Sequence, residues 1–329
     1  MKKGKLIFTA FVCSLTFLFA TNVHAATPIA DEFEESFVNA VMEQYDITRE
    51  EFTDEWAKQQ TELVLNGKEI GGIDKGGVNE HVLAAYFPNL EILDLGNNSL
   101  GGLPNFPATL KTINVEDNNI TGLPNLPATL ETLNVSGNKL VALPDLPANL
   151  VSLVASDNEL PGLPALPANL KVLNVSNNKL PGLPDLPATL EYLNVSNNEL
   201  PGLPAFPAAL KSLDISNNQI PDILPLPEGL KSFNMSNNLF TSLPTLPGGL
   251  TTLDITGNEI KEVLLSQLPE TLETFNSDVE VTDDITAADD TQERVEEENP
   301  ETSDGILLFI GIAVVGLAGT ALAYRRLHN

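Results

Sequence analysis

The chain has 329 residues, a formal net charge of −28 and a pI near 4.2. Its acidic side chains are spread over most of its length, which excludes a nucleic-acid ligand because the phosphates would be repelled. This acidity indicates a solvated surface or a cationic partner. No metal-ligand spacing, nucleophile elbow or phosphate loop is found, so we expect no metal, no cofactor and no catalysis.

Residues 1–25 have the pattern of a signal peptide. Three lysines precede an apolar run, and a small-x-small site predicts cleavage between Ala25 and Ala26. The single cysteine, Cys13, lies in that run. After cleavage the chain would therefore hold no disulfide, thiolate metal site or thiol nucleophile.

Residues 26–80 are expected to form a small helical cap. Apolar residues at helical spacing predict a helix from about Glu32 to Tyr45. A capping box over 48–51 predicts the start of a second helix that carries Phe52 and Trp56. A cap would shield the first core layer of a repeat array from water. The alternative is that these helices are themselves a binding module.

Residues 81–275 contain one sequence repeated with a period of 20. A degenerate strand at 63–65 and a helical turn at 82–86 are expected before the first repeat. One unit, residues 170–188, reads LKVLNVSNNKLPGLPDLPA. The complete units begin at Leu90, Leu110, Leu130, Leu150, Leu170, Leu190, Leu210, Leu230 and Leu250, and an incomplete tenth begins at Leu272. A fixed period of this length is typical of a solenoid.

Each column of the repeat has an expected role, illustrated by the unit that begins at Leu170. Alternation predicts a short strand in which Leu173 and Val175 point inward. Val172, Asn174 and Ser176 then point outward. Two further features follow the strand: Asn178, expected to bond the backbone at a buried turn, and the Leu-Pro-x-Leu-Pro stretch, expected to be extended with both leucines dipping into the core.

The pattern Leu-x-x-Leu-x-Leu/Val-x-x-Asn-x-Leu resembles the leucine-rich repeat. The resemblance implies a leucine-rich-repeat solenoid with parallel strands on one face, an extended, polyproline-like back and a small N-terminal helical cap. Because no unit buries enough apolar surface alone, we expect stability to be cooperative along the array.

The C-terminal segment divides into an acidic stretch, 276–298, and a final part, 299–329. The acidic stretch is expected to be a disordered tether. In the final part, the uncharged run 305–324 is long enough to span a bilayer, and two arginines follow it. Before this run stand the residues of a Pro-x-Thr motif, namely Asn299, Pro300, Thr302 and Ser303.

This arrangement resembles a sortase sorting signal of Gram-positive bacteria, although Asn299 and Ser303 replace the usual Leu and Gly. The resemblance implies that a sortase cuts after Thr302 and joins its carboxyl group to cell-wall peptidoglycan. The alternative is a single-pass membrane protein with its N-terminus outside the cell.

The repeats also resemble those of bacterial effectors injected into host cells, some of which carry a ubiquitin-ligase domain with a catalytic cysteine. The signal peptide, the anchor and the missing cysteine exclude that enzyme. The overall plan is more similar to the internalins, surface proteins of which several bind host receptors.

We therefore expect a non-catalytic binding or adhesion protein, anchored at the cell surface, that uses its strand face to bind a protein or glycan. The alternatives are a structural spacer of the wall and a surface hydrolase. The candidate binding residues are Val154, Val172, Asn174, Tyr192 and Asn194, because an apolar centre interrupts a small polar face there. The recurring Asn-Val-Ser triplets match a glycosylation sequon, which we attribute to the repeat.

Overall fold

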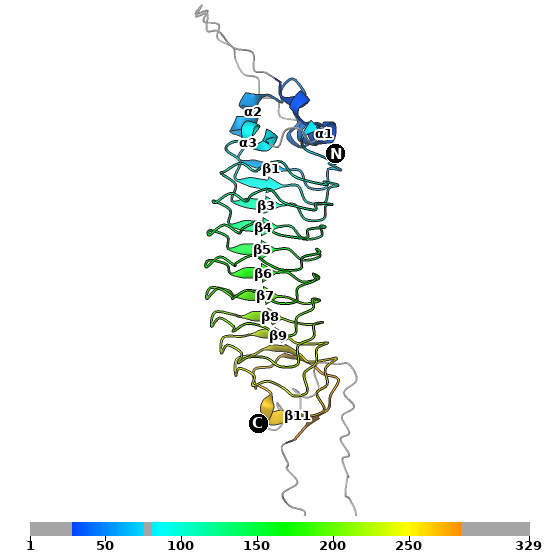
Figure 1. Ribbon diagram of the computed structural model, residues 1–329, viewed down its shortest axis with the longest axis vertical. Helices are drawn as coiled ribbons and strands as arrows, with labels where there is room; N and C mark the ends of the chain where they lie inside the picture. Colours follow the sequence, from blue (N-terminus) through cyan, green and yellow to red (C-terminus); the bar gives the residue numbers. More distant parts are fainter. Residues whose placement is uncertain (1–27, 76–80, 284–329) are drawn as a thin grey trace, which may run out of the picture.

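The computed structural model describes residues 28–75 and 81–283, which form a tall, nearly straight column of coils with helices at one end (Figure 1). The predicted signal peptide, sorting signal and apolar run 305–324 lie outside these residues. Within the described ranges, no helix combines the length and the hydropathy needed to cross a bilayer.

One face of the column is a parallel sheet of eleven strands that follow one another in chain order. The strands are β1 (Glu62–Val64), β2 (Ile92–Asp94), β3 (Thr112–Asn114), β4 (Thr132–Asn134), β5 (Ser152–Val154), β6 (Val172–Asn174), β7 (Tyr192–Asn194), β8 (Ser212–Asp214), β9 (Ser232–Asn234), β10 (Thr252–Asp254) and β12 (Thr274–Asn276). The predicted degenerate strand is β1, which makes the sheet one strand longer than the ten repeats. A solenoid of leucine-rich repeats is confirmed.

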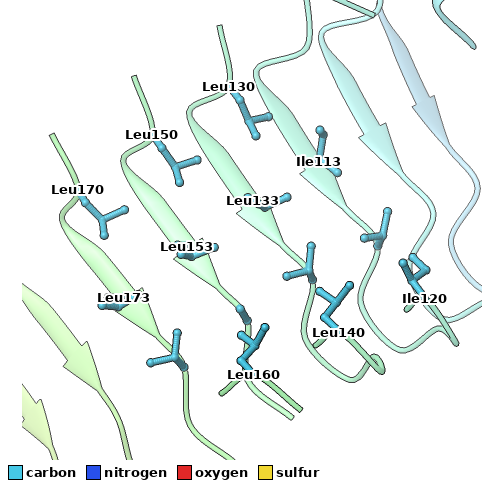
Figure 2. Packing of buried hydrophobic residues seen from close by; sticks show 14 of the residues in the cluster. Ile113, Ile120, Leu130, Leu133, Leu140, Leu150, Leu153, Leu160, Leu170 and Leu173 are labelled. Atoms are coloured by element: carbon cyan, nitrogen blue, oxygen red, sulfur yellow. The ribbon is translucent and has the colours of Figure 1, made fainter. Parts of the chain in front are cut away.

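Columns of identical apolar positions run through the core, as Figure 2 shows. Leu173 pairs in register with Leu153 and Leu193, and it is fully buried, as is Val175. Each coil is therefore closed by the apolar side chains of its neighbours. The predicted inward column is confirmed.

The repeated asparagine is a buried link between coils. Nδ2 of Asn178 donates to the carbonyls of Ala155, Val175 and Ser176 at 2.9, 3.1 and 3.1 Å. Oδ1 accepts from the amide of Leu160 at 3.0 Å. Both the amide nitrogen and the amide oxygen are thus bonded to backbone groups, so the predicted structural role is confirmed.

The residue before this asparagine adopts the left-handed conformation in nine coils. Asn177, for example, has φ = 54°. The members of this column are Asn97, Asp117, Gly137, Asp157, Asn177, Asn197, Asn217, Asn237 and Gly257. Only Gly, Asn and Asp enter this region at low cost, which explains the composition of the column.

The back of each coil is extended, as predicted: residues 182–187 form neither helix nor strand. Leu183 and Leu186 pack against the core but stay partly exposed. The prediction that they dip into the core is therefore met only in part. The fully buried positions are supplied by the strand and by the residues on either side of it, such as Leu170 before β6 and Leu180 after it.

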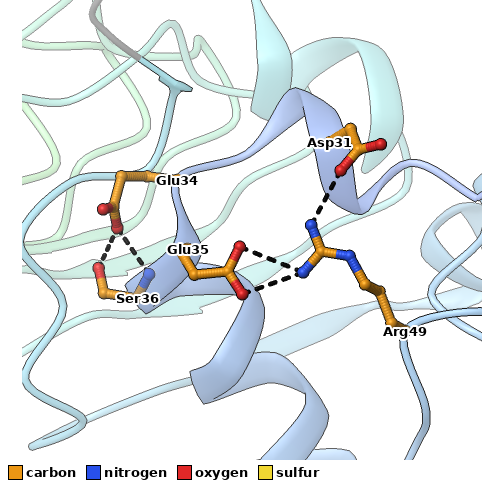
Figure 3. A network of polar contacts seen from close by, with 5 residues as sticks. All are labelled: Asp31, Glu34, Glu35, Ser36 and Arg49. Carbon is orange, nitrogen blue, oxygen red and sulfur yellow. Dashed lines mark hydrogen bonds and ion pairs between the residues drawn. The ribbon is translucent and has the colours of Figure 1, made fainter.

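The helices cover the first coil. They are η1 (Ala30–Glu32), α1 (Glu35–Tyr45), α2 (Asp54–Gln59) and α3 (Val82–Tyr86). The prediction of one helix from about Glu32 is wrong at its start, because the Glu34 amide donates to Ile73 O at 2.9 Å and its backbone is extended. The Glu34 side chain then caps α1 by accepting from Ser36 (Figure 3).

The predicted capping box forms but closes a turn. Thr48 N donates to Glu51 Oε2 at 2.8 Å, and Glu51 N donates to Thr48 Oγ1 at 3.3 Å. The helix α2 begins later, because Thr53 caps it by accepting from Trp56 N. The second helix is thus present and carries Trp56, but the prediction that it carries Phe52 is wrong, because Phe52 lies before the Thr53 cap.

The cap blocks the outer edge of the sheet. Tyr45 Oη donates to Glu62 O and accepts from Val64 N, both at 3.1 Å, which occupies exposed polar groups of β1. Arg49 bonds Asp31 and Glu35 across the cap (Figure 3), and its hydrogen bond lowers the pKa of Asp31. An edge strand treated in this way cannot pair with another chain.

The far end is more ordered than predicted. The chain after β10 forms β11 (Val263–Leu264) and η3 (Leu265–Gln267), and β13 (Val281–Thr282) pairs in parallel with β11 after β12. The prediction of a disordered tether from residue 276 is wrong for 276–282, because this pairing and the packing of Val279 and Val281 on the core hold them. Residues 284–298 lie outside the described part.

Candidate functional site

The outward face of the sheet carries a column of local turns. Asn174 Oδ1 accepts from the Ser176 amide at 3.2 Å and from the Ser176 hydroxyl at 2.9 Å. Asn194 holds Ser196 in the same way, at 3.0 and 2.8 Å. The Asn-Val-Ser triplets are therefore Asx turns at the ends of the strands that carry them.

These turns correct the expected surface. Ser176, predicted to point outward, is only 6% exposed. The Oδ1 atoms of Asn174 and Asn194 are likewise occupied by the turn, while their amide nitrogens find no acceptor among the described residues. These two predicted binding residues can thus offer a partner hydrogen-bond donors only.

The predicted apolar residues lie together on this face. Val172 pairs in register with Tyr192. Val154 pairs with Asn174 and is therefore a diagonal neighbour of Val172, two residues along the strand from the direct partner Ser152. All three apolar side chains are half-buried. We call Val154, Val172 and Tyr192 the strand-face patch. Paired strands set Val172 and Tyr192 about 5 Å apart at the backbone, and the diagonal neighbour Val154 lies about 7–8 Å from Val172.

Val154 breaks the column of turns. Every equivalent residue from Asp94 to Asn276 is Asn or Asp, except at this position. Valine has no oxygen to accept from the Ser156 amide, so the coil of β5 lacks the side-chain acceptor that its neighbours have. A residue that breaks a local rule without a packing gain indicates a functional position.

We predict that Val154→Asn is more stable than Val154→Ala by about 1 kcal/mol, because only asparagine rebuilds the Asx turn. Both variants remove the same apolar side chain, so alanine is the matched reference. Urea denaturation measures the difference. Equal midpoints would mean that the turn contributes nothing at this coil.

Charged side chains flank the patch, as predicted. Lys171 and Glu191 form an ion pair at 3.7 Å. The sequence interpretation missed Lys211, which also pairs with Glu191, at 2.5 Å. Its hydrogen bond, followed by its charge and that of Lys171, lowers the pKa of Glu191.

The described residues hold few rival sites. None of their histidine, cysteine, aspartate and glutamate side chains form a group of three or more able to hold a metal ion. A depression of about 350 Å³ on the back, between the coils of β8 and β9, is lined by prolines, apolar residues that include Leu224, 48% exposed, two hydroxyl residues and one acid, Asp222. A single carboxylate does not form a charge pattern that would select a ligand.

Comparison with known proteins agrees with the fold. The Leucine Rich Repeat family matches segments 89–108, 169–188 and 209–228, each one coil long. No curated protein sequence matches the chain significantly.

Two bacterial proteins with solved structures share the fold and most of the length. YopM of Yersinia pestis, a leucine-rich effector protein, is 29% identical over 78% of this chain and 79% of its own, with a TM-score of 0.57. The functional domain of InlJ from Listeria monocytogenes is 19% identical over 79% and 73%, with a TM-score of 0.53.

YopM of Yersinia enterocolitica is 32% identical over 59% of this chain, with a TM-score of 0.48. The chain spans about half the length of that relative, 52%. The repeat period, the matched segments and the eleven-stranded parallel sheet together show that this chain has the fold of a leucine-rich-repeat solenoid.

Proposed function

We propose that this protein is a non-catalytic binding protein of the cell surface, and that the strand-face patch binds a protein partner. The observation that carries the proposal is the substitution of Val154 for the turn-forming asparagine, beside Val172 and Tyr192. An apolar centre with an aromatic anchor and a charged rim is the arrangement of an interface core.

The solenoid fold and the likeness to an effector protein support binding rather than catalysis. The test is a pull-down with the purified chain against host-surface and wall extracts. Recovery of a partner that Tyr192→Ala loses supports the proposal. Failure to recover any partner favours a spacing role in the wall.

We predict that Tyr192→Ala weakens binding by about 2 kcal/mol or more and leaves the melting temperature nearly unchanged, because the ring lies on the outer face. Titration calorimetry with the recovered partner measures the affinity. Ile92→Ala is the matched control, because Ile92 occupies the same column near the N-terminal end of the sheet and is 39% exposed. Equal affinity of Tyr192→Ala and wild type would move the site elsewhere, to the helical cap first.

Anchoring to peptidoglycan by a sortase is part of the proposal and is supported by the sequence of residues 299–329. We predict that Thr302→Ala moves the protein from the wall fraction to the membrane fraction, because Thr302 would supply the carboxyl group that is transferred. Glu301→Ala, at the variable position of the motif, is the control. Equal release of Thr302→Ala and wild type by muramidase would contradict sorting.

A further inference from the structure

The residues that precede the strands form a second column, which we call the edge column. The amides of Glu191, Lys211 and Lys231 each donate to the carbonyl of the equivalent residue one coil earlier, at 2.8 Å, so the column is stacked in register. Its members are Glu91, Lys111, Glu131, Val151, Lys171, Glu191, Lys211, Lys231, Thr251 and Glu273.

Charged neighbours in this column are of opposite sign at most steps. Lys111 lies 2.9 Å from Glu91, and Glu191 lies between Lys171 and Lys211. Opposite charges on adjacent strands stabilise a sheet, and like charges destabilise it. The alternation is therefore what a purely structural column would contain.

The step from Lys211 to Lys231 departs from this alternation. Two lysines are neighbours there, in a chain with 17 basic and 45 acidic residues. Lys231 Nζ donates to Gly249 O at 3.1 Å, and no carboxylate in the described part of the chain forms an ion pair with it. Lys211 shares its one carboxylate, Glu191, with Lys171.

This cationic step lies beside the strand-face patch. Ser212 follows Lys211 and pairs in register with Tyr192. Lys211 and Lys231 are therefore one and two strand spacings from the Tyr192 strand, or about 5 and 10 Å. The side chain of Lys211 is 63% exposed, so a bound molecule can reach it.

Within the described residues, the outward carboxylate of β8, Asp214, makes hydrogen bonds and forms no ion pair with Lys211 or Lys231. Asp214 Oδ1 accepts from the Ser216 amide at 3.0 Å and from its hydroxyl at 2.7 Å. Its Oδ2 accepts from Asn234 Nδ2 at 3.3 Å. Asp214 thus serves the Asx turn of its own coil, and the edge column from Lys171 to Lys231 carries three positive charges and one negative.

Resting on the proposed function, we infer that the partner is a protein segment that sets an apolar side chain on the strand-face patch and a carboxylate against Lys211 and Lys231. The net charge of −28 attracts cationic partners to the chain as a whole at long range. Lys211 and Lys231 form a local positive region that attracts a carboxylate instead. A polyanionic glycan needs a longer row of cations than two lysines and gains little from an apolar centre.

The test uses three sets of short synthetic peptides on the purified full chain. All carry a central leucine or tyrosine, and the residues beside it are glutamate, glutamine or lysine. The glutamate set should bind about tenfold more tightly than the glutamine set, and the lysine set least. Lys231→Glu should abolish the preference, while Lys111→Glu, the same change in the same column far from the patch, should keep it.

Other outcomes separate this inference from the proposed function. Equal binding of the glutamate and glutamine sets, still lost in Tyr192→Ala, overturns the inference and leaves the patch as the binding site. If the Tyr192→Ala substitution leaves the peptide affinity unchanged, the proposed binding site is overturned. The protein-segment inference is overturned if no peptide binds at a concentration of about 1 mM. It is also overturned if the protein binds heparin more tightly than every peptide and this binding depends on Lys231.

Discussion

Leu173→Asp is expected to destroy the cooperative unfolding of the middle coils. The leucine side chain is fully buried and stacked between Leu153 and Leu193, so the substitution removes core packing and buries a carboxylate with no cationic partner. The first effect costs about 2–5 kcal/mol, and an unpaired buried charge costs several more. The free energy of unfolding should fall by about 5 kcal/mol or more, measured by urea denaturation.

A solenoid transmits this damage only through neighbouring coils. The coils on either side of β6 should therefore unfold at separate midpoints in the variant, whereas wild type should show one transition. Ser152→Asp, on the outer face of the adjacent strand, is the control and should change stability by less than about 1 kcal/mol. A melting temperature for Leu173→Asp within about 2 °C of wild type would contradict the strand register.

The solenoid could be predicted because each column is sampled many times. Leu173, Val175 and Asn178 belong to columns that repeat with one residue type or a close relative, so periodicity alone identifies them as structural. The same repetition revealed the outlying residues Val154 and Tyr192.

The cap could be predicted only in outline, because its boundaries depend on contacts distant in sequence. The start of α1 is set by Glu34, whose amide bonds Ile73. The capping box at 48–51 has the expected hydrogen bonds, yet Thr53 begins the helix. The same reason explains residues 276–282: their acidic composition indicates disorder, while the pairing of β13 with β11 is invisible in local sequence.

The site was predicted in part. Register fixed which residues share the outer face, so the apolar group was found. The hydrogen bonds from Ser176 to Asn174 were not predicted, because an outward polar residue follows the same alternation whether it faces solvent or bonds the backbone of its own coil. The signal was present in the Asn-Val-Ser triplets, which match an Asx turn as well as a sequon.

Asn178→Leu is the second variant with a large expected effect. The substitution leaves the buried Leu160 amide without its acceptor and removes the donor that three carbonyls share. Each buried group left unsatisfied costs about 1–3 kcal/mol, so we expect a loss of about 4 kcal/mol in the free energy of unfolding. Asn177→Gly, at the exposed left-handed position beside it, should change stability little. A loss below about 1 kcal/mol would mean that the ladder is dispensable.

Asn178→Asp separates the donor role from the acceptor role and makes the loss pH-dependent. The introduced carboxyl group can still accept from Leu160, but its second oxygen would face three carbonyl oxygens, at the 2.9–3.1 Å that Nδ2 now spans. That environment favours the protonated form, so the folded-state pKa rises above the unfolded value of about 3.9. The deficit relative to wild type should be smallest below about pH 4 and should grow as pH rises through the folded pKa. The deficit of Asn178→Leu should stay constant over the same range, and a constant deficit for both variants would exclude the donor role.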